Sequence, residues 1–377
     1  MANSWRIATL ADRHKALGSK LEDWNGMPTA WTYDQDINAD YEAVRTKAGI
    51  MDVSGLKKVH VTGPAATQVV ERATTRNMAK MMPGRSVYAC MLNDAGKFID
   101  DCVIYRNGPN SYLVVHGTGL GTEQLTTAAN GKDVTVKYDD DMHDISVQGP
   151  LAVDLLEKQV PAIRDLAYFG HIQTGIYGKP VMISRTGYTG ERGYEIFCRG
   201  QDAPAIWDGL VADGAPMGIT PVQFGILDML RVESYLLFYP GDNSETFPFE
   251  NDTTGDTLWE LGLDFTVSPN HGGFRGAEEH ARLKGKERFK IWGLKFDNPE
   301  VPEIGSEVFD GETKIGVVTQ GLRSDLNGYT VALSRLPVDY AVNGKKVSVK
   351  SNGKDLTAQT HSLPFYDVEK KLRVAKG

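Results

Sequence analysis

Two adjacent carboxylates interrupt a segment that otherwise has the pattern of a buried strand, KFIDDCVIYR at 97–106. Side chains alternate between the faces of a strand, so Asp100 and Asp101 face opposite ways, and each has apolar neighbours on its own face. A carboxylate in such a place costs free energy unless it accepts hydrogen bonds or binds a ligand. The alternative is that one aspartate caps a turn and the other faces solvent, and the pattern alone leaves both interpretations open.

A third carboxylate of this kind closes the phrase RTGYTGERGYEIF at 185–197, where Glu195 stands between Tyr194 and Ile196. Glycines recur at every third position before it, which predicts a strand, a tight turn and a second strand. Glu195 is then either an exposed strand residue or part of a binding site.

An arginine joins these acids in GILDMLRVESYLLFY, residues 225–239, which has the spacing of an apolar helix. Arg231 on this helix is either a ligand-binding cation or the i,i+3 ion-pair partner of Asp228. Separated acids with a partly buried arginine suit a small molecule that carries a cationic or amidine-like group.

A glycine loop resembles a nucleotide-binding motif without matching it. YLVVHGTGLGTEQL (112–125) places glycines at 117, 119 and 121, whereas a dinucleotide fold needs G-x-G-x-x-G and a parallel crossover. The preceding strand is reached by a four-residue turn, which indicates antiparallel pairing, so a simple strand-to-helix turn is the better interpretation. Nothing in the sequence matches a G-x-S-x-G nucleophile or an H-E-x-x-H metal motif.

These residues must be positioned by a mixture of helices and strands. Hydrophobic periodicity predicts helices at 40–49 (N-cap Asp40, ended by Gly49), 64–75, 121–130 and 225–239. It predicts strands at 59–61, 86–92, 97–106, 111–117 and 134–138, hence a compact α+β domain over 52–140. After a charged linker at 284–288, short strands at roughly ten-residue spacing predict a C-terminal barrel or sandwich.

Length and composition limit the class of protein. A chain of 377 residues predicts two or three domains. The net charge of −8 and the absence of a basic run argue against a nucleic-acid partner, and no apolar run is long enough to cross a membrane. The three cysteines fit neither a disulfide framework nor a zinc site, so we expect reduced thiols, no metal and a cytoplasmic location.

Several phrases together carry a family resemblance: VRTKAGIMDVS (44–54), MLNDAGKFIDDCVIY (91–105), ISVQGP (145–150), RTGYTGERGYEIF (185–197) and LRVE (230–233). In this order they resemble the T-protein (aminomethyltransferase) family of tetrahydrofolate-dependent one-carbon transferases. The ending LPFYDVEKKLR (363–373) is more similar to the family's tetrahydrofolate-dependent demethylases, which act on compounds such as dimethylsulfoniopropionate, methylamines or betaines.

The resemblance implies a three-domain, cloverleaf-like α+β fold around a central folate channel. A folate-binding α+β domain would comprise residues 1–51 and 141–280, a ferredoxin-like α+β domain 52–140, and a C-terminal β-barrel 289–377.

The same resemblance assigns roles within the site. Asp101 would lie against the N5/N10 edge of tetrahydrofolate as the catalytic residue, Glu195 would accept hydrogen bonds from the pterin ring, and Arg231 would lie near the acid groups. Tyr188, Leu56 and Tyr88 would complete the cofactor site. The glycines before Glu195 would let the backbone turn tightly beside the flat ring.

Departures from the glycine-cleavage pattern bear on the substrate. Gly55-Leu56 and His116 stand where those T-proteins usually have His-Met and Asn. The expected activity is therefore transfer of a methyl group from a small N- or S-methylated compound to N5 of tetrahydrofolate. Aromatic candidates for holding the methylated group are Trp24, Trp31, Tyr33 and Tyr239, although each is also an ordinary core residue type.

Two alternatives stay open. One is the aminomethyltransferase of the glycine cleavage system, which would need a lipoyl carrier protein as partner. The other is a non-catalytic folate-binding protein.

Overall fold

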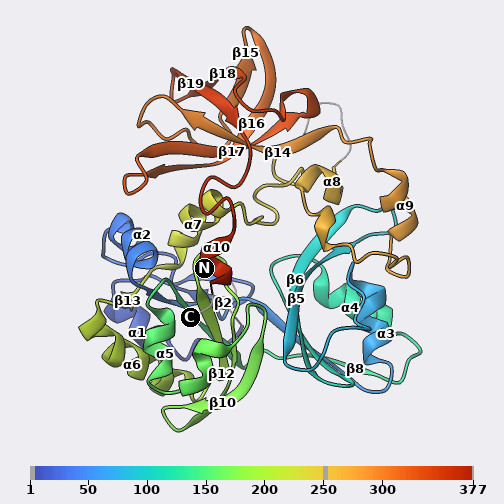
Figure 1. The fold of residues 1–377 in the computed structure, drawn as a ribbon, viewed down its shortest axis with the longest axis vertical. Helices are drawn as coiled ribbons and strands as arrows, with labels where there is room; N and C mark the ends of the chain where they lie inside the picture. The colour runs from blue at the N-terminus through green and yellow to red at the C-terminus, as the bar shows by residue number, and fades with distance from the viewer. Residues whose placement is uncertain (1–4, 249–253, 376–377) are drawn as a thin grey trace.

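Three sheets organise the chain in the computed structural model, which describes residues 5–248 and 254–375. The outermost residues of the first and third predicted domains lie outside these ranges. A six-stranded and a five-stranded sheet lie side by side, and a closed barrel stands above both (Figure 1). The predicted α+β class and the C-terminal barrel are confirmed.

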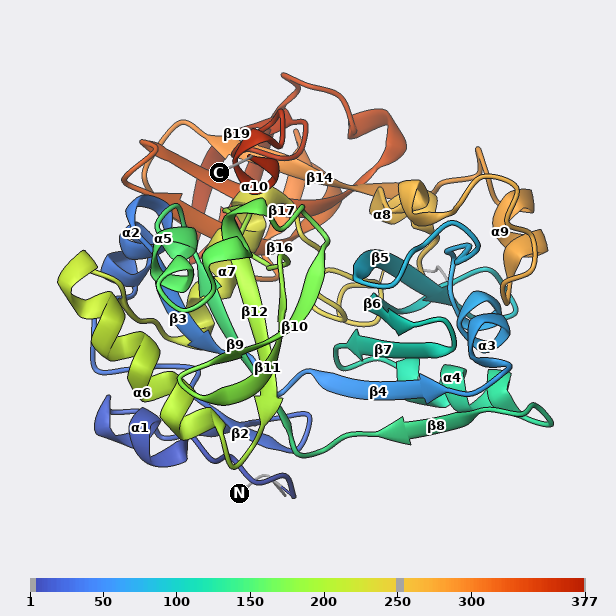
Figure 2. The same ribbon diagram turned by 60° about the horizontal axis from the view of Figure 1, so that its bottom comes forward.

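The six-stranded sheet has the order β10-β11-β12-β9-β3-β13. Its strands are β3 Gly49–Asp52, β9 Met142–Gln148, β10 His171–Ile176, β11 Lys179–Ser184, β12 Gly193–Arg199 and β13 Thr220–Pro221. Its helices are α1 Ala11–Ala16, α2 Ile37–Thr46, α5 Ala152–Glu157 and α6 Ala203–Gly214, with short 3-10 turns η1 Pro161–Asp165 and η2 Ala215–Met217. Side chains of α5 and α6 pack on one face of the sheet, which leaves the other face toward the five-stranded sheet (Figure 2).

The five-stranded sheet has the order β5-β6-β7-β4-β8 and is covered by α3 Ala66–Ala73 and α4 Gly121–Ala129. Its strands are β4 Lys57–Thr62, β5 Arg85–Leu92, β6 Phe98–Gly108, β7 Ser111–His116 and β8 Thr135–Tyr138. These elements confirm the strands and helices predicted for 52–140. β6 and β7 pair antiparallel, which excludes a dinucleotide-type parallel crossover before the glycine loop.

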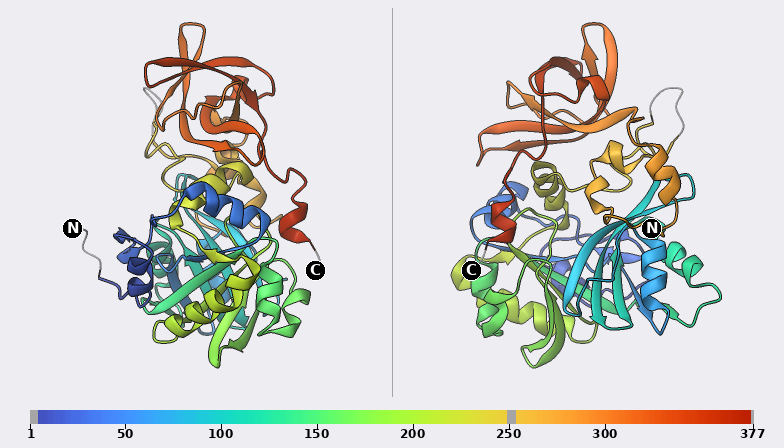
Figure 3. Two further views of the ribbon diagram at one scale, coloured as in Figure 1. Left: turned by 90° about the vertical axis from the view of Figure 1, so that its left-hand side faces the viewer. Right: turned by 45° about the vertical axis from the view of Figure 1, so that its right-hand side comes forward.

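The barrel closes in the order β14-β17-β16-β15-β18-β19. Its strands are β14 Phe289–Phe296, β15 Glu307–Asp310, β16 Thr313–Ser324, β17 Tyr329–Pro337, β18 Lys346–Ser351 and β19 Lys354–His361, with the turn η5 Val338–Tyr340. After the barrel the chain descends to α10 Lys371–Val374 beside the six-stranded sheet (Figure 3). There Arg185 donates to the carbonyl oxygen of Ala375.

Two helices differ from the sequence prediction at their ends. Asp36, not Asp40, caps α2, because the Asp36 carboxylate accepts from the backbone N–H of Asn38 at 3.0 Å. Asp40 is instead buried one turn further on and accepts from Gln223. The helix predicted for 225–239 is shorter: η3 Phe224–Ile226 leads into α7 Leu227–Ser234, which ends where Tyr235 adopts a positive φ.

Residues 235–244 form an irregular segment with turns, here called the strap, which leads from α7 toward the barrel. The chain then passes through α8 Leu258–Leu261, η4 Asp264–Thr266 and α9 Ala277–Arg282. This part, which the sequence places with the first domain, packs on the five-stranded sheet, since Leu258 and Phe274 share a buried cluster with Phe98. The N-terminal hairpin β1 Glu22–Trp24 and β2 Met27–Thr29 completes the described elements. Among the described residues, no helix has both the length and the apolar character needed to cross a bilayer.

Candidate functional site

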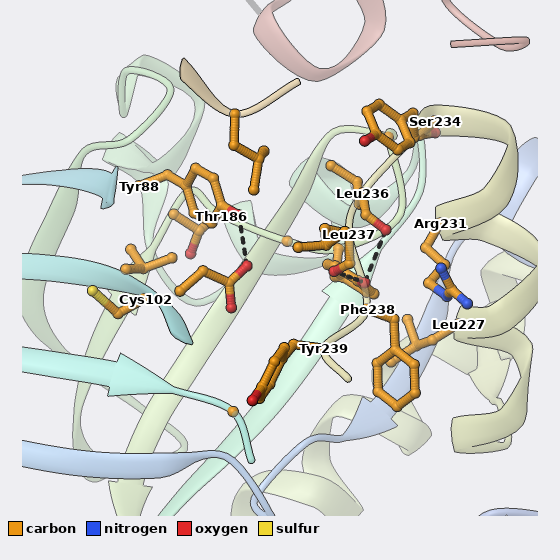
Figure 4. A pocket seen from close by; sticks show the side chains of 18 of the residues that line it. Tyr88, Cys102, Thr186, Leu227, Arg231, Ser234, Leu236, Leu237, Phe238 and Tyr239 are labelled. Atoms are coloured by element: carbon orange, nitrogen blue, oxygen red, sulfur yellow. Dashed lines mark hydrogen bonds between the residues drawn. The ribbon is translucent and has the colours of Figure 1, made fainter. Parts of the chain in front are cut away.

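A cavity of about 910 Å³ lies where the two sheets, α7, the strap and barrel strand β14 meet. Side chains from several of these elements point into it (Figure 4). The predicted residues that line it are Trp24, Trp31, Leu56, Tyr88, Asp101, Tyr188, Glu195, Arg231 and Tyr239. The structure therefore brings together residues that are up to 215 positions apart in the sequence, from Trp24 to Tyr239.

Asp101 projects from β6 into this cavity. The Tyr88 hydroxyl donates to Asp101 Oδ2 at 2.6 Å, and Oδ1 has no hydrogen-bond partner among the described residues. Burial, followed by the negative charge of Asp100, raises the pKa of Asp101 to about 7. A carboxyl group with this pKa can both hold and release a proton near neutral pH.

Asp100 has a different environment. It is 1% exposed, and its carboxylate accepts from the backbone N–H of Asp101 at 2.9 Å, from Gly121 at 2.8 Å and from His116 Nδ1 at 2.8 Å. The strand pattern leaves open which aspartate serves the site, and the family resemblance assigns Asp101. In the structure Asp100 is fully bonded within the protein, whereas Asp101 has an oxygen to offer a ligand.

Glu195 lies on the face of β12 that looks away from the helices. Its Oε2 accepts from the hydroxyls of Thr186 and, at 3.3 Å, Tyr105, and Oε1 has no partner among the described residues. Burial raises the pKa of Glu195. Sequence reasoning missed both supporting hydroxyls, although Tyr105 shares the strand face of Asp101 and Thr186 lies within the glycine phrase.

Glycine is required at these positions of the phrase for two different structural reasons. Gly190 adopts a φ of +83°, which favours glycine. A Cβ on Gly187 or Gly193 would instead collide with the side-chain amide of Gln148. These two glycines therefore make room for a buried glutamine, which donates to the Thr186 carbonyl at 3.1 Å.

A second buried carboxylate lies behind Glu195 on the neighbouring strand. Asp144 of β9 is fully buried, and neither oxygen has a hydrogen-bond partner in the described chain. Burial and then the charge of Glu195 raise the pKa of Asp144, while burial lowers the pKa of nearby Lys58 to about 8.

Arg231 is anchored on both sides by aspartates. Its Nε donates to Asp228 at 3.1 Å, the i,i+3 pair that the sequence offers as the alternative, and Nη1 donates to Asp242 of the strap at 2.6 Å. Nη2 has no partner among the described residues and Arg231 lines the cavity. Arg231 therefore uses Nε and Nη1 within the protein, and Nη1 holds the strap in place. Only Nη2 remains available to bind a ligand.

The strap forms one wall of the cavity. The Tyr188 hydroxyl donates to the carbonyl oxygens of Leu236 and Leu237, and the latter bond is the shorter one. Phe238 and Tyr239 then face the cavity, with the Tyr239 ring 5.4 Å from that of Phe98 (Figure 4).

Two of the remaining aromatic candidates line the cavity and one does not. Trp24 and Trp31 line the cavity and each packs against Phe224 with ring centroids 4.6 Å apart. Tyr33 is not among the lining residues: it is 7% exposed, and its hydroxyl bonds His14 Nδ1 at 2.8 Å. The predicted contact between Tyr33 and a substrate is therefore not supported, because a buried hydrogen bond occupies its polar end.

The remaining two cofactor candidates, Leu56 and Tyr88, also line the cavity. Leu56 packs with the buried clusters of α7 and of the sheet interface, and Tyr88 lies on β5 beside Asp101. No group of three or more His, Cys, Asp or Glu side chains in the described part of the chain is arranged to hold a metal ion.

Comparison with known proteins agrees with this architecture. The GCVT N-terminal domain family matches residues 10–270, and the glycine cleavage T-protein C-terminal barrel domain family matches residues 290–367. The chain is 56% identical to the heme-dependent oxidative N-demethylase gamma subunit of Ectopseudomonas mendocina (strain ymp) over the whole of both chains. It is 32% identical to an aminomethyltransferase of Saccharopolyspora erythraea, covering 97% of this chain and 99% of the other.

A solved structure has the same fold. The crystal structure of glycine cleavage system aminomethyltransferase T from Bartonella henselae superposes with a TM-score of 0.84 at 26% identity, covering 97% of this chain and 98% of that one. Sequence, fold and both family matches agree, and the chain belongs to the glycine cleavage T-protein family.

Proposed function

We propose that this protein is a tetrahydrofolate-dependent one-carbon transferase that captures the carbon removed from the N-methyl group of a small amine by an oxidising partner subunit. The observation that carries the proposal is the pair of incompletely bonded carboxyl groups, Asp101 and Glu195, in one cavity. The name of the Ectopseudomonas mendocina relative supports the amine and the partner subunit.

The residues present fit a reduced folate. A pterin ring presents an amino group and a ring N–H side by side, and one carboxylate can accept from such donors. Glu195 has Oε1 free for this purpose, while Thr186 and Tyr105 hold its other oxygen. A cavity of about 910 Å³ is within the range of small-molecule and cofactor sites.

Tetrahydrofolate, when bound, supplies the nucleophilic nitrogens that accept the one-carbon unit. The protein's part is to orient the ring through Glu195 and to manage protons through Asp101. With a pKa of about 7, Asp101 can hold a proton on Oδ1 or accept one from a folate nitrogen as that nitrogen forms its bond to carbon. Tyr88 keeps the carboxyl group oriented through Oδ2.

The oxidation state of the donor decides the product. Oxidative removal of an N-methyl group yields carbon at the level of formaldehyde, and condensation with tetrahydrofolate then releases one water molecule and gives 5,10-methylenetetrahydrofolate. Direct transfer of a methyl group to N5, the activity expected from the sequence, would give 5-methyltetrahydrofolate instead. Trp24, Trp31 and Tyr239, which all line the cavity, favour this second candidate, because aromatic faces hold methylated cations.

One experiment separates these candidates. Purified protein is incubated with tetrahydrofolate and either formaldehyde or a series of methylated amines, betaines and sulfonium compounds, and the folate products are separated by chromatography. We expect accelerated 5,10-methylenetetrahydrofolate formation with formaldehyde, and loss of the acceleration in Asp101→Asn. Formation of 5-methyltetrahydrofolate from a methylated donor alone would replace the proposal with direct methyl transfer.

Two further outcomes concern partners. Turnover of an aminomethyl-lipoyl carrier protein would identify a glycine-cleavage aminomethyltransferase, whereas folate binding without any acceleration would identify a binding protein. Under the proposal, affinity-tagged protein purified from cells of its native organism carries a heme-containing partner. The visible absorption spectrum of the purified complex reveals the heme.

A further inference from the structure

The glycine loop at 117–121 closes over the carboxylate of Asp100. A Cβ on Gly119 would lie 2.5 Å from Asp100 Cγ, and a Cβ on Gly121 would lie 2.9 Å from Asp100 Oδ2 and 2.7 Å from His116 Nδ1. Side chains at these positions would therefore push the loop away from the carboxylate. The motif that mimics a nucleotide loop in the sequence instead surrounds an anion of the protein itself.

The two neighbouring aspartates differ in their hydrogen-bond donors. Three N–H groups, from Asp101, Gly121 and His116, point at Asp100, whereas Asp101 receives only the Tyr88 hydroxyl. Hydrogen bonds to the charged form stabilise that form. Burial and then the negative charge of Asp100 raise the pKa of Asp101, so the donors that surround Asp100 also bear on the proton of Asp101.

Hydrogen bonds at both ring nitrogens fix the orientation of the His116 side chain. Its Nδ1 bonds Asp100 at 2.8 Å and its Nε2 bonds the Thr122 hydroxyl in the first turn of α4 at 2.8 Å. The ring is 1% exposed, so both nitrogens are used inside the protein. His116 is therefore a positioning residue that acts through Asp100.

Four further titratable groups around Asp101 are neutral at neutral pH, and beside them the charged Arg76 donates to the Tyr88 carbonyl oxygen at 2.8 Å. Burial raises the pKa of each of these four groups, which are Tyr88 and Cys90 of β5, Cys102 of β6 and Tyr188 of the glycine phrase. Tyr239 of the strap also has its pKa raised to about 12, by burial and by the charges of Glu245 and Asp100. Asp100 is thus the negative charge that acts directly on Asp101.

We propose that His116 and the glycine loop hold the negative charge on Asp100 and thereby make Asp101 the carboxyl group that carries the exchangeable proton of the site. The inference deepens the proposed function, in which Asp101 manages protons during one-carbon transfer. It also gives a role to the histidine that departs from the glycine-cleavage pattern.

The first test uses the protein without folate or donor, so that it is independent of the proposed function. Infrared difference spectra follow the C=O band of protonated carboxyl groups from pH 5 to 9, and the band lost in Asp101→Asn belongs to Asp101. In the wild type we expect its midpoint near pH 7, following the pKa of Asp101. In Asp100→Asn the midpoint should fall by about one to two units, because the like charge is gone.

A second variant keeps the test valid if Asp100→Asn does not fold. Gly121→Ala leaves the charge of Asp100 in place but displaces the donors, and the φ of Gly121 is not positive, so the backbone tolerates alanine. We expect the Asp101 midpoint to fall by about half a unit or more, because Asp100 without these donors holds its negative charge less firmly and repels a charge on Asp101 less. Leu120→Ala, in the same loop with a side chain 52% exposed, is the matched control and should leave the midpoint unchanged.

Two results would overturn the inference: a midpoint that does not fall in the folded variants, or a band that survives Asp101→Asn and disappears in Asp100→Asn. The pH profile of one-carbon transfer provides an independent kinetic check. Its acidic limb should shift with the infrared midpoint while the KM for tetrahydrofolate stays the same. A protein that passes the infrared test and shows no folate chemistry would contradict the proposed function alone.

Discussion

Identical side-chain chemistry acquires different properties within this cavity. Asp100 and Asp101 are neighbours in the chain, yet three N–H donors saturate the first and a single hydroxyl contacts the second. Glu195 is held through one oxygen and leaves the other open. The surroundings of each carboxylate, more than its residue type, therefore determine what it can bind.

Glu195→Gln should weaken tetrahydrofolate binding by roughly 10–100-fold, because a hydrogen bond to a charged acceptor contributes about 1.5–3 kcal/mol. Isothermal titration calorimetry measures the effect. Tyr105→Phe removes only the 3.3 Å bond to the same carboxylate and should cost less. Equal affinities of Glu195→Gln and wild type would show that the pterin lies elsewhere.

Asp101→Asn should raise thermal stability at alkaline pH. The pKa of Asp101 is raised from 3.8 to about 7 on folding, so the folded protein keeps a proton that the unfolded chain releases. This contribution to stability is complete below about pH 4 and is lost as the pH rises to about 7. The variant should melt about 2–5 °C above wild type at pH 8, with the difference vanishing near pH 4.

Differential scanning fluorimetry across this pH range measures the difference. The exposed Asp140→Asn serves as control and should show no such trend. A melting difference for Asp101→Asn that is constant with pH would contradict the raised pKa.

At the scale of elements, the strap at 235–244 shapes the cavity without belonging to a helix or strand. It is fixed by Arg231 through Asp242 and by Tyr188 through two backbone carbonyls. Asp242 also accepts from the Thr319 hydroxyl of the barrel at 2.7 Å and is fully buried. The strap is therefore held in place at a junction of α7 and barrel.

Asp242→Asn should destabilise the protein by about 3–5 kcal/mol, because removing one partner of a buried ion pair leaves the other charge uncompensated. Hydrogen exchange measured by mass spectrometry should speed up at 236–244. Asp228, the other partner of Arg231, has a side chain that is 40% exposed, so Asp228→Asn should cost less than about 1 kcal/mol. Similar effects of the two variants would contradict a strap fixed by Asp242.

At the scale of the whole molecule, one buried carboxylate joins the six-stranded sheet domain to the barrel. Glu233 of α7 accepts from Tyr41 at 2.8 Å and Arg45 at 2.7 Å on one side, and from Asn327 at 3.0 Å and Tyr329 at 2.6 Å on the other. It is 0% exposed. The relative position of the domains, and with it the cavity, depends on this junction.

Glu233→Gln should lower the free energy of unfolding by about 3 kcal/mol, through the loss of charge opposite Arg45. Differential scanning calorimetry should show the barrel melting as a separate, earlier transition. Glu300→Gln, which removes an exposed pair with Lys354, should leave a single transition. A single unshifted transition in Glu233→Gln would argue against this junction.

The sequence predicts α2, α3, α4, α7, the strands β4 to β8 and the short strands of the C-terminal barrel, because their hydrophobic periodicity is local. A carboxylate in an apolar strand marks Asp101 and Glu195 as candidates, but the strand pattern leaves their exposure open, and only the family resemblance assigns both to a site. The sequence does not predict the ion pair between Arg231 and Asp242 or the hydrogen bond between His14 and the Tyr33 hydroxyl. In each case the partner comes from an irregular or a distant segment of the chain. Long-range pairing leaves no periodic signal along the chain.

The carboxyl groups and the aromatic residues of the cavity lie on different segments of the chain, which has a practical consequence for protein engineering. The carboxyl groups assigned to folate lie on β6 and β12, whereas Phe238 and Tyr239 stand on a short segment between two anchors. If the protein transfers methyl groups directly, which is the second candidate function, exchanging residues 236–241 for those of another family member, with Arg231 and Asp242 kept, should change which methylated compounds are accepted and leave folate affinity intact. Residues 236–241 thus form a segment that can be exchanged while the carboxyl groups on β6 and β12 stay as they are.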